Sequence, residues 1–148
     1  MSNSEVIKVE KVSKPDDMDK IFSIRRKVFV EEQGVSEEEE YDEYEQTSTH
    51  YMALINDKIV ATARWRKTNN GIKLERFAVL ADYRSSGMGS ALIVQMLTDI
   101  GKQSVPIYLH AQLTAVGLYH KFRFSKVGNI FEEAGILHYK MVLSPDRS

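Results

Sequence analysis

The segment Arg84-Ser85-Ser86-Gly87-Met88-Gly89, followed by Ser90, has the composition of an anion-binding site. Its two glycines let the backbone turn tightly and approach a ligand without obstruction by side chains. Free N–H groups of Gly87 to Ser90 at the start of a helix would point outward and, with the positive end of the helix dipole, bind phosphate oxygens. Arg84 would add a full charge at the rim. The alternative interpretation is that both glycines merely shape a turn and that Arg84 is a solvated loop residue.

Two common phosphate motifs do not fit this segment. No lysine follows the second glycine, as the P-loop of nucleotide hydrolases requires, and no third glycine completes the dinucleotide fingerprint. What remains is the short pattern R-x-x-G-x-G, which also arises by chance because glycine is a common residue. The elements around the segment therefore decide what it means.

The first part of the chain predicts a strand and a helix. Residues 5–12 alternate well enough for a strand, after which Ser13, Pro15 and Asp16 supply an N-cap, a tolerated first-turn proline and an acidic third position. Apolar residues then recur at helical spacing until an end near Gln33-Gly34. The acidic run that follows is expected to be a short helix or a loop.

Three β-rich runs follow, and turn residues separate them, which predicts an antiparallel meander; the runs are residues 51–55, 59–65 and 72–80. A loop over residues 81–86 then leads into an apolar stripe from Met88 to Ile100 that is typical of a helix, closed by Gly101. The glycine-containing segment therefore lies between a strand and a helix, where an anionic ligand is expected.

The last part of the chain predicts a strand over residues 107–111, a helix marked by Ala111, Ala115, Leu118 and Phe122, and strands over residues 124–127 and 135–143 with a frayed charged tail. The element order is β-α-α-β-β-β-α-β-α-β-β. No repeat, low-complexity tract or linker divides the chain, so we expect a single mixed α/β domain spanning residues 1–148.

Composition excludes several classes of protein. The 148 residues are 43% hydrophobic and include no cysteine, so neither a disulfide framework nor a cysteine nucleophile is available. The net charge of −1 gives no support to nucleic-acid binding. Neither His50 nor His138 has a partner at metal-ligand spacing, so we predict no metal. No stretch approaches the length of a membrane span and residues 1–10 lack a signal-peptide core, so we expect a cytoplasmic protein that does not bind membranes.

A second motif lies downstream of the glycines, in the segment Ala115-Val116-Gly117-Leu118-Tyr119-His120-Lys121-Phe122-Arg123-Phe124. The two motifs together resemble the GNAT superfamily of N-acetyltransferases, in which Ala115, Leu118, Tyr119 and Phe124 match the family pattern and Arg123 stands where glycine is usual. The resemblance covers almost the whole chain. It implies a central, mixed, mostly antiparallel twisted sheet of six to seven strands flanked by about four helices.

Three outer segments resemble, more narrowly, a bacterial subgroup related to the ElaA and YjcF proteins. They are Arg26-Lys27-Val28-Phe29-Val30-Glu31-Glu32-Gln33, then Asp42 and His50, and Glu133-Ala134-Gly135-Ile136-Leu137-His138. They indicate the family without naming an acceptor, although His50 and His138 could line the acceptor pocket.

The resemblance implies acetyl-coenzyme A (acetyl-CoA) as co-substrate. Main-chain groups of Phe77, Ala78 and Val79 are expected to pair with its pantetheine arm like an added strand, and an N–H near Val79 to polarise the thioester carbonyl. Residues 84–90 would grip the pyrophosphate. Gln112 occupies the position where many relatives have an asparagine that contacts the cofactor, and a homodimer is common in such folds.

Direct transfer to an amine needs a proton donor for the departing thiolate and a base for the amine. Tyr119 matches the family position of the donor, and a phenol with a pKa near 10 keeps its proton at neutral pH. Its alternative role is a core aromatic. Glu75, His110 and His138 are candidate bases. Glu75 could equally form an ordinary ion pair, and His110 could be a structural hydrogen-bonding residue at a strand end.

Charge clusters leave further alternatives open. The run from Glu37 to Glu45 contains seven carboxylates, which could attract a cationic amine, although a solvated surface is the favoured interpretation. Arg25, Arg26 and Arg64 could mark an anionic substrate or pair with those carboxylates. We expect an N-acetyltransferase that acts on a primary amine of a small molecule. The alternatives are a non-catalytic acyl-CoA-binding or sensing module, or an interaction domain that uses the acidic surface.

Overall fold

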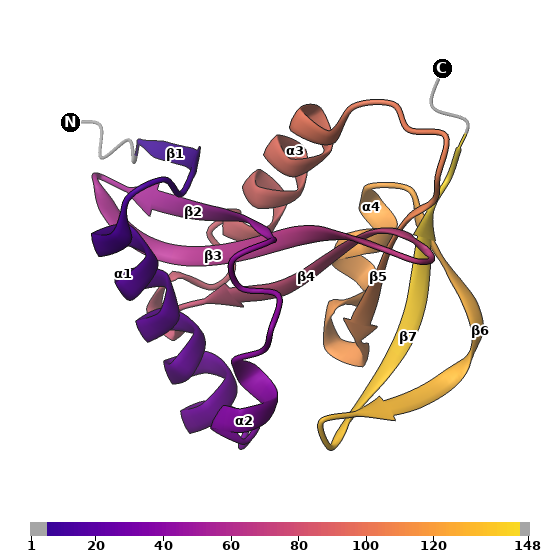
Figure 1. Ribbon diagram of the computed structural model, residues 1–148, viewed down its shortest axis with the longest axis horizontal. Coiled ribbons are helices and arrows are strands. Elements are labelled where there is room, and N and C mark those ends of the chain that lie inside the picture. Colours follow the sequence, from indigo (N-terminus) through magenta and orange to yellow (C-terminus); the bar gives the residue numbers. More distant parts are fainter. Residues whose placement is uncertain (1–5, 146–148) are drawn as a thin grey trace.

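A seven-stranded mixed sheet forms the centre of the computed structural model, which describes residues 6–145 (Figure 1). The strands are β1 (Ile7–Lys11), β2 (Thr49–Ile55), β3 (Lys58–Thr68), β4 (Gly71–Val79), β5 (Ile107–Gln112), β6 (Phe124–Glu133) and β7 (Ile136–Leu143). Their order across the sheet is β1-β2-β3-β4-β5-β7-β6. Neighbouring strands are antiparallel except β4 and β5, which are parallel. The predicted meander and fold class are confirmed.

Helices cover both faces of the sheet (Figure 1). They are α1 (Pro15–Arg25), a π-helical segment (Arg26–Glu32), α2 (Glu37–Glu40), α3 (Met88–Ile100) and α4 (Val116–Lys121), with short 3-10 turns at Ala81–Tyr83 and Leu113–Ala115. The larger core packs α3 and α4 against one face, with Leu92, Ile93, Met96 and Phe124 fully buried. A smaller core packs α1 and the π-helical segment against the other face, around Ile24, Val28 and Ala78. Amphipathic helices on both faces bury the alternating apolar residues of the strands.

Several predicted boundaries are wrong in detail. The N-cap of α1 is Lys14 rather than Ser13, without a side-chain hydrogen bond, and the helix starts at Pro15. The first helix reaches Gln33 as expected, but its last part is π-helical. Strand β6 runs from Phe124 to Glu133 rather than ending near Val127, because a change of register between Val127 and Phe131 lets it resume pairing with β7. Glu5, and part of the tail predicted to be frayed, lie outside the described residues.

The corner between α4 and β6 keeps the backbone conformation that favours glycine. Arg123 has a φ of +73°, in the left-handed region, although the family pattern has glycine there. The substitution therefore leaves the corner in place and moves the conformational strain onto an arginine.

At the centre of the sheet, β4 and β5 pair over only part of their length. Strands β4 and β5 pair only through Ile72–Leu74 and Ile107–Leu109, and no pairing between them is described beyond Leu74 and Leu109. In β4, Arg76 and Phe77 lie opposite the single residue Ala63 of β3, and Arg76 has a φ of +60°, as in a β-bulge. The bulge bends the second half of β4 as it leaves β5. We call the resulting gap, between residues 75–79 and 110–112, the wedge.

Candidate active site

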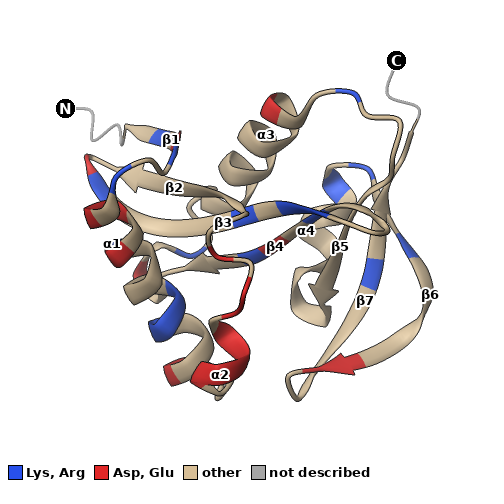
Figure 2. Ribbon diagram, in the orientation of Figure 1, with Lys and Arg blue, Asp and Glu red and all other residues tan. Residues whose placement is uncertain are grey.

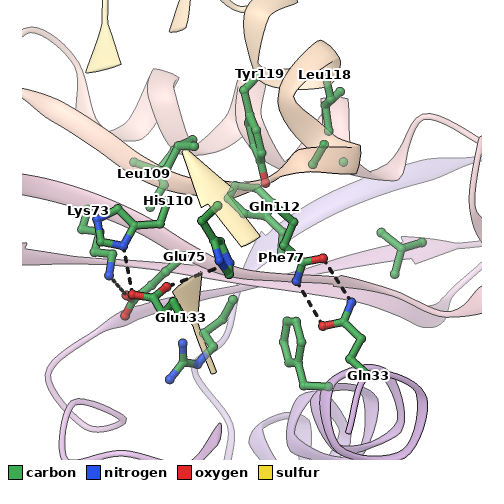
Figure 3. A pocket seen from close by; sticks show the side chains of 17 residues that line it. Gln33, Lys73, Glu75, Phe77, Leu109, His110, Gln112, Leu118, Tyr119 and Glu133 are labelled. Carbon is green, nitrogen blue, oxygen red and sulfur yellow. Dashed lines mark hydrogen bonds and ion pairs between the residues drawn. The ribbon is translucent and has the colours of Figure 1, made fainter. Parts of the chain in front are cut away.

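A cavity of about 220 Å³ occupies the wedge. Glu75, Phe77 and Val79 line it from β4, His110 and Gln112 from β5, and Tyr119 from α4 (Figure 3). The structure thus brings together the three residues that the sequence predicted to be catalytic, although they come from separate elements. Met88 and Ala78 are core residues with 1% exposure and line no part of this cavity.

The main chain of β4 presents polar groups to the wedge. The N–H of Leu80 donates to the carbonyl of Val60 on β3, with an N–O distance of 2.9 Å. In a strand, the N–H and C=O of one residue point to the same side, and those of the next residue point to the other side. The N–H and C=O groups of Val79 and Phe77 therefore point away from β3, toward the wedge. These groups can pair with an extended ligand, as an added strand would.

The bulge at Arg76 is held from outside the sheet by the acidic segment. Its guanidinium lies 3.2 Å from Glu40 Oε1 and 3.2 Å from Asp42 Oδ2, and it also donates to the carbonyls of Glu39 and Glu40. An arginine with a positive φ persists only where its surroundings determine the conformation. These contacts therefore fix the direction in which β4 continues along the wedge.

The glycine turn lines a second cavity of about 410 Å³, which shares Val79, Gly89 and Leu118 with the first. Gly87 is the N-cap of α3 with a φ of +89°, and no side-chain oxygen caps the helix there. The first N–H groups of α3 thus have no capping side chain and suit phosphate oxygens. A Cβ at Gly89 would lie 3.0 Å from Leu118 Cδ2, so this glycine also permits close packing against α4.

Arg84, Ser85 and Ser86 are held in defined conformations beside the glycines. Arg84 Nε donates to the Val79 carbonyl with an N–O distance of 3.0 Å, and its guanidinium pairs with Glu32 at the end of the π-helical segment. Ser85 has a φ of +66°, and the Ser86 hydroxyl donates to the Tyr83 carbonyl. Arg84 is therefore an exposed residue at the rim of the second cavity that is nevertheless bonded to Val79 and Glu32.

Tyr119 projects from α4 into the wedge, and its hydroxyl points toward the cavity (Figure 3). The ring is 6% exposed and makes edge contacts with Phe77 and Phe124, with centroid distances of 5.5 and 6.2 Å. Burial raises the pKa of the phenol well above its ordinary value. Tyr119 is thus both a packed aromatic and a protonated hydroxyl at the cavity.

Glu75 lies among permanent cations. Its Oε2 accepts from Arg64 Nε at 2.7 Å and Arg66 Nε at 2.8 Å, and Lys73 Nζ lies 3.3 Å from Oε1. Burial alone would raise the pKa of Glu75, but the charges of Arg64, Lys73 and Arg66 hold it below its usual value. The predicted ion pairs of Glu75 are present, and they make its carboxylate a weak proton acceptor.

The acidic segment, which is red at α2 and in the chain just after it in Figure 2, supplies the other carboxylates of this ion-pair network. Arg64 is 1% exposed and donates to Asp42 at 3.0 Å and to Glu45 at 2.9 Å, and the equally buried Arg25 pairs with Glu40 and Glu45. Burial raises the pKa of Asp42, but the hydrogen bond and charge of Arg64, the N–H of Tyr44 and the charge of Arg76 together outweigh it and lower the pKa to about 2. The favoured interpretation of a merely solvated acidic surface is therefore wrong for Glu40, Asp42 and Glu45. The pairing predicted as the rival role of the arginines is confirmed.

His110 faces the cavity beside a carboxylate that the sequence did not single out as catalytic. Its Nδ1 lies 3.1 Å from Oε2 of Glu133 at the end of β6 (Figure 3). His138 lines the same cavity and its Nδ1–H donates to the Ile136 carbonyl at 2.7 Å. His50, by contrast, lies 2.7 Å from the Glu45 carbonyl and lines a different groove, beside α1, so it does not join the cavity.

The cavity residues missed as site candidates include Gln33, Lys73 and Glu133. The side chains of Gln33 and Gln112 exchange hydrogen bonds of 3.0 and 3.4 Å across the mouth of the wedge (Figure 3). Gln33 and Glu133 belong to the outer segments that resemble the bacterial subgroup, so that resemblance was the available indication. No sequence motif indicated Lys73, because it reaches the cavity only through the pairing of β4 with β5.

Two general properties of the described residues bear on function. Within residues 6–145, no group of three or more histidine and carboxylate side chains is arranged to hold a metal ion. No helix in the same range is long and apolar enough to cross a membrane.

Comparison with known proteins identifies relatives along nearly the whole chain. The sequence model of one family, described as an acetyltransferase (GNAT) domain, matches residues 10–145. The uncharacterized N-acetyltransferase YjcF of Bacillus subtilis (strain 168) is 37% identical over 125 residues, covering 82% of this chain and 88% of YjcF. The crystal structure of Escherichia coli ElaA superposes with a TM-score of 0.82 at 25% identity, covering 94% of this chain and all of that one. An acyl-CoA N-acyltransferase from Pseudomonas aeruginosa shares the fold with a TM-score of 0.78 at 19% identity, covering 95% of this chain and 100% of that one.

Proposed function

The chain belongs to the GNAT acetyltransferase family, and on that premise we propose that it transfers the acetyl group of acetyl-CoA to a primary amine of a small molecule. One observation carries the proposal. The cavity at the glycine turn and the cavity in the wedge adjoin each other, since Val79, Gly89 and Leu118 line both, so an anion-binding end lies next to a reaction end.

The chain's own groups fit a long ligand with a phosphate-bearing end. The N–H groups of residues 87–90 would hold the pyrophosphate, and the main chain of Phe77 and Val79 would pair with the pantetheine arm. Arg84 would leave Glu32 to contact a phosphate, since both partners are half-exposed and can exchange ligands in water. Gln112 would contact the ligand at the mouth of the wedge, where it now pairs with Gln33.

Acetyl-CoA supplies a thioester, and transfer forms a bond from the amine nitrogen to its carbonyl carbon as the bond from that carbon to sulfur breaks. Tyr119 donates its phenolic proton to the departing sulfur, a role that its burial supports because the neutral phenol is favoured. The N–H of Val79, which points toward the wedge, donates to the carbonyl oxygen as negative charge develops there.

The proton that the amine loses goes to a base on the sheet face opposite Tyr119. His110 is the better candidate, because an imidazole accepts protons near neutral pH. Glu75 remains the alternative, but its ion pairs with Arg64, Arg66 and Lys73 stabilise the carboxylate against protonation.

The test combines ligand binding with turnover. Acetyl-CoA at about 100 times its Kd should add about 2.7 kcal/mol to the free energy of unfolding, visible as a rise in melting temperature. With an amine found by screening, Tyr119→Phe should reduce kcat on the order of a hundredfold and leave acetyl-CoA binding intact. Tyr139→Phe is the control, since this half-buried tyrosine lines neither cavity.

The outcomes separate the alternatives. Stabilisation by acetyl-CoA without turnover on any amine would favour a non-catalytic acyl-CoA-binding module. No stabilisation would contradict the proposed ligand altogether. Full turnover in Tyr119→Phe would remove the proton-donor role from Tyr119 and leave the acetyl transfer itself in place.

A further inference from the structure

The turn between β6 and β7 brings a carboxylate and an imidazole to the wedge. Only Ala134 and Gly135 separate the two strands, and both have a positive φ, of +52° and +77°. This is the backbone of a tight two-residue hairpin, which fixes the register of the strands on either side. Glu133 therefore pairs with Ile136, and Phe131 with His138. The two-residue turn therefore determines how Glu133 and His138 lie relative to each other.

Strand alternation places these side chains on the face that carries His110. Gln112 pairs with His138 and His110 with Lys140 across β5 and β7, while Phe131 pairs with His138 across β6 and β7. Residues paired in this way, and those two positions along a strand, share one face of the sheet. Glu132, one position from Glu133, points to the other face and is exposed.

Glu133 contacts both histidines of the cavity. Its Oε2 lies 3.1 Å from His110 Nδ1, and its Oε1 lies 4.0 Å from His138 Nε2. The hydrogen bond to His110 and the nearby charge of Lys73 outweigh burial and lower the pKa of Glu133 to about 2. An ionised carboxylate only accepts hydrogen bonds, so Nδ1 of His110 must be the donor. Its other nitrogen, Nε2, then carries the lone pair in the neutral ring.

Aromatic contacts hold the His110 ring in one orientation. The edge of the Phe131 ring packs against it with a centroid distance of 4.9 Å, and Tyr108 lies 6.0 Å away on its own strand. Phe131 in turn stacks on His138 at 5.8 Å. A ring held by one hydrogen bond and two aromatic neighbours loses little further freedom when it acts as a base.

We propose that Glu133 is a positioning residue that fixes the Nδ1–H tautomer of His110 and thereby presents Nε2 as the proton acceptor for the amine. The inference rests on the proposed acetyl transfer. As the amine nitrogen bonds to the acetyl carbon, its proton passes to Nε2 of His110, and the sulfur that leaves that carbon takes the proton of Tyr119. His110 becomes an imidazolium, and the negative charge of Glu133 stabilises it.

The other charged groups around His110 are fixed by the fold. Lys73 and Glu75 face it from β4, and Lys140 is its cross-strand partner on β7. Lys73 is already paired with Glu75, and Lys140 lies over the Tyr108 ring at 5.1 Å. Glu133 is thus the carboxylate in hydrogen-bond contact with this imidazole within residues 6–145.

Nitrogen-15 NMR of the histidine rings tests the tautomer without any need for activity. At a pH where His110 is neutral, the wild-type ring should show a protonated Nδ1 and a bare Nε2. Glu133→Ala should redistribute the proton between both nitrogens, since its acceptor is lost. Glu133→Gln should keep the tautomer, because the amide oxygen still accepts, and the control Glu132→Ala should leave the spectrum unchanged.

Kinetics with a responsive primary amine, chosen from an amino acid, a polyamine, an amino sugar and a short peptide, supply the second readout. Glu133→Ala should lower kcat by about tenfold to a hundredfold with little change in the KM for acetyl-CoA, a smaller effect than removal of the base itself. Glu133→Gln removes the negative charge that stabilises the imidazolium, so the acid limb of the pH–rate profile should move to lower pH.

The outcomes keep this proposal distinct from the proposed function. A protonated Nε2 in the wild-type ring, or an unchanged tautomer in Glu133→Ala, would overturn the positioning role whatever the activity. A full wild-type kcat and pH profile in both Glu133 variants would overturn it as well. If no amine is acetylated by the wild-type protein, the proposed function fails, while the NMR result still decides the tautomer.

Discussion

Two carboxylates line the wedge from opposite walls, and their surroundings differ. Glu75 on β4 is 7% exposed in its side chain and is bound by Arg64, Arg66 and Lys73, whose charges persist at neutral pH. Glu133 on β6 is 45% exposed and contacts two imidazoles, each of which can bind or release a proton. A carboxylate among permanent cations serves as a structural counter-ion. A carboxylate beside a titratable ring can influence where that ring holds its proton.

The residues that lie behind each carboxylate also differ. Glu75 is the inner end of a network that continues through Arg64 to Asp42 and Glu45 and that anchors the acidic segment to the sheet. Glu133 lies beside the hairpin and the stacked rings of Phe131 and His138, without a comparable run of buried ion pairs described behind it. We therefore expect changes in the first region to affect folding most and changes in the second to affect proton transfer most.

The largest expected effect is on stability. Arg64→Met would leave Glu75, Asp42 and Glu45 without their shared partner, and breaking a buried pair in this way costs about 3–5 kcal/mol of the free energy of unfolding. Urea denaturation measures it. The matched control is Arg26→Met, whose surface pair with Glu37 is exposed to solvent and should contribute far less to stability. Equal losses in the two variants would contradict a structural role for the network.

Two variants, one at each carboxylate, test the comparison of Glu75 with Glu133 directly. Glu75→Gln should lower the free energy of unfolding by about 1–3 kcal/mol, because three cations lose their charged partner. Its kcat, measured where the protein is folded, should stay within about twofold of wild type if His110 is the base. Glu133→Gln should change stability by less than about 1 kcal/mol, since solvent screens its exposed carboxylate. A folded Glu75→Gln protein with no turnover would instead identify Glu75 as the base.

The smallest expected effect is on acid stability. Asp42 and Glu133 both have a pKa of about 2 in the folded protein, against ordinary values of 3.8 and 4.5. A lowered folded-state pKa stabilises the protein above the ordinary value, and this contribution disappears as the pH falls toward 2. Asp42→Asn and Glu133→Gln should each flatten the dependence of stability on pH between 4.5 and 2, with the smaller effect at the more exposed Glu133. Urea titrations across this range provide the measurement.

Local patterns sufficed for the parts of the site that depend on consecutive residues. The glycine turn, α3 and the meander were predicted because turn chemistry and periodicity act within a few residues. The placement of Tyr119 on a helix likewise followed from the spacing of Ala115, Leu118 and Phe122, and the family pattern suggested its role. The wedge could not be predicted, because it depends on where the pairing of β4 with β5 stops and on a bulge at Arg76.

Long-range partners account for the rest. Glu133 and His110 are 23 positions apart in the sequence. They come together because β7 pairs both with β6, which carries Glu133, and with β5, which carries His110. The acidic segment was predicted to be a solvated surface because charge runs usually are, whereas its partner Arg64 lies on a strand 22 positions beyond Asp42. Sequence spacing alone cannot show which of several arginines is buried beneath a carboxylate.

The short junction between β4 and β5 has a mechanical consequence. Three residue pairs, at Ile72–Leu74 and Ile107–Leu109, provide the described strand pairing between a four-stranded and a three-stranded part of the sheet. A ligand that forms hydrogen bonds with the backbones of both β4 and β5 would link the two parts of the sheet across the wedge, so that they move less independently. Amide hydrogens along β5 and β7 should then exchange with deuterium more slowly when the ligand is bound, even at positions it never touches.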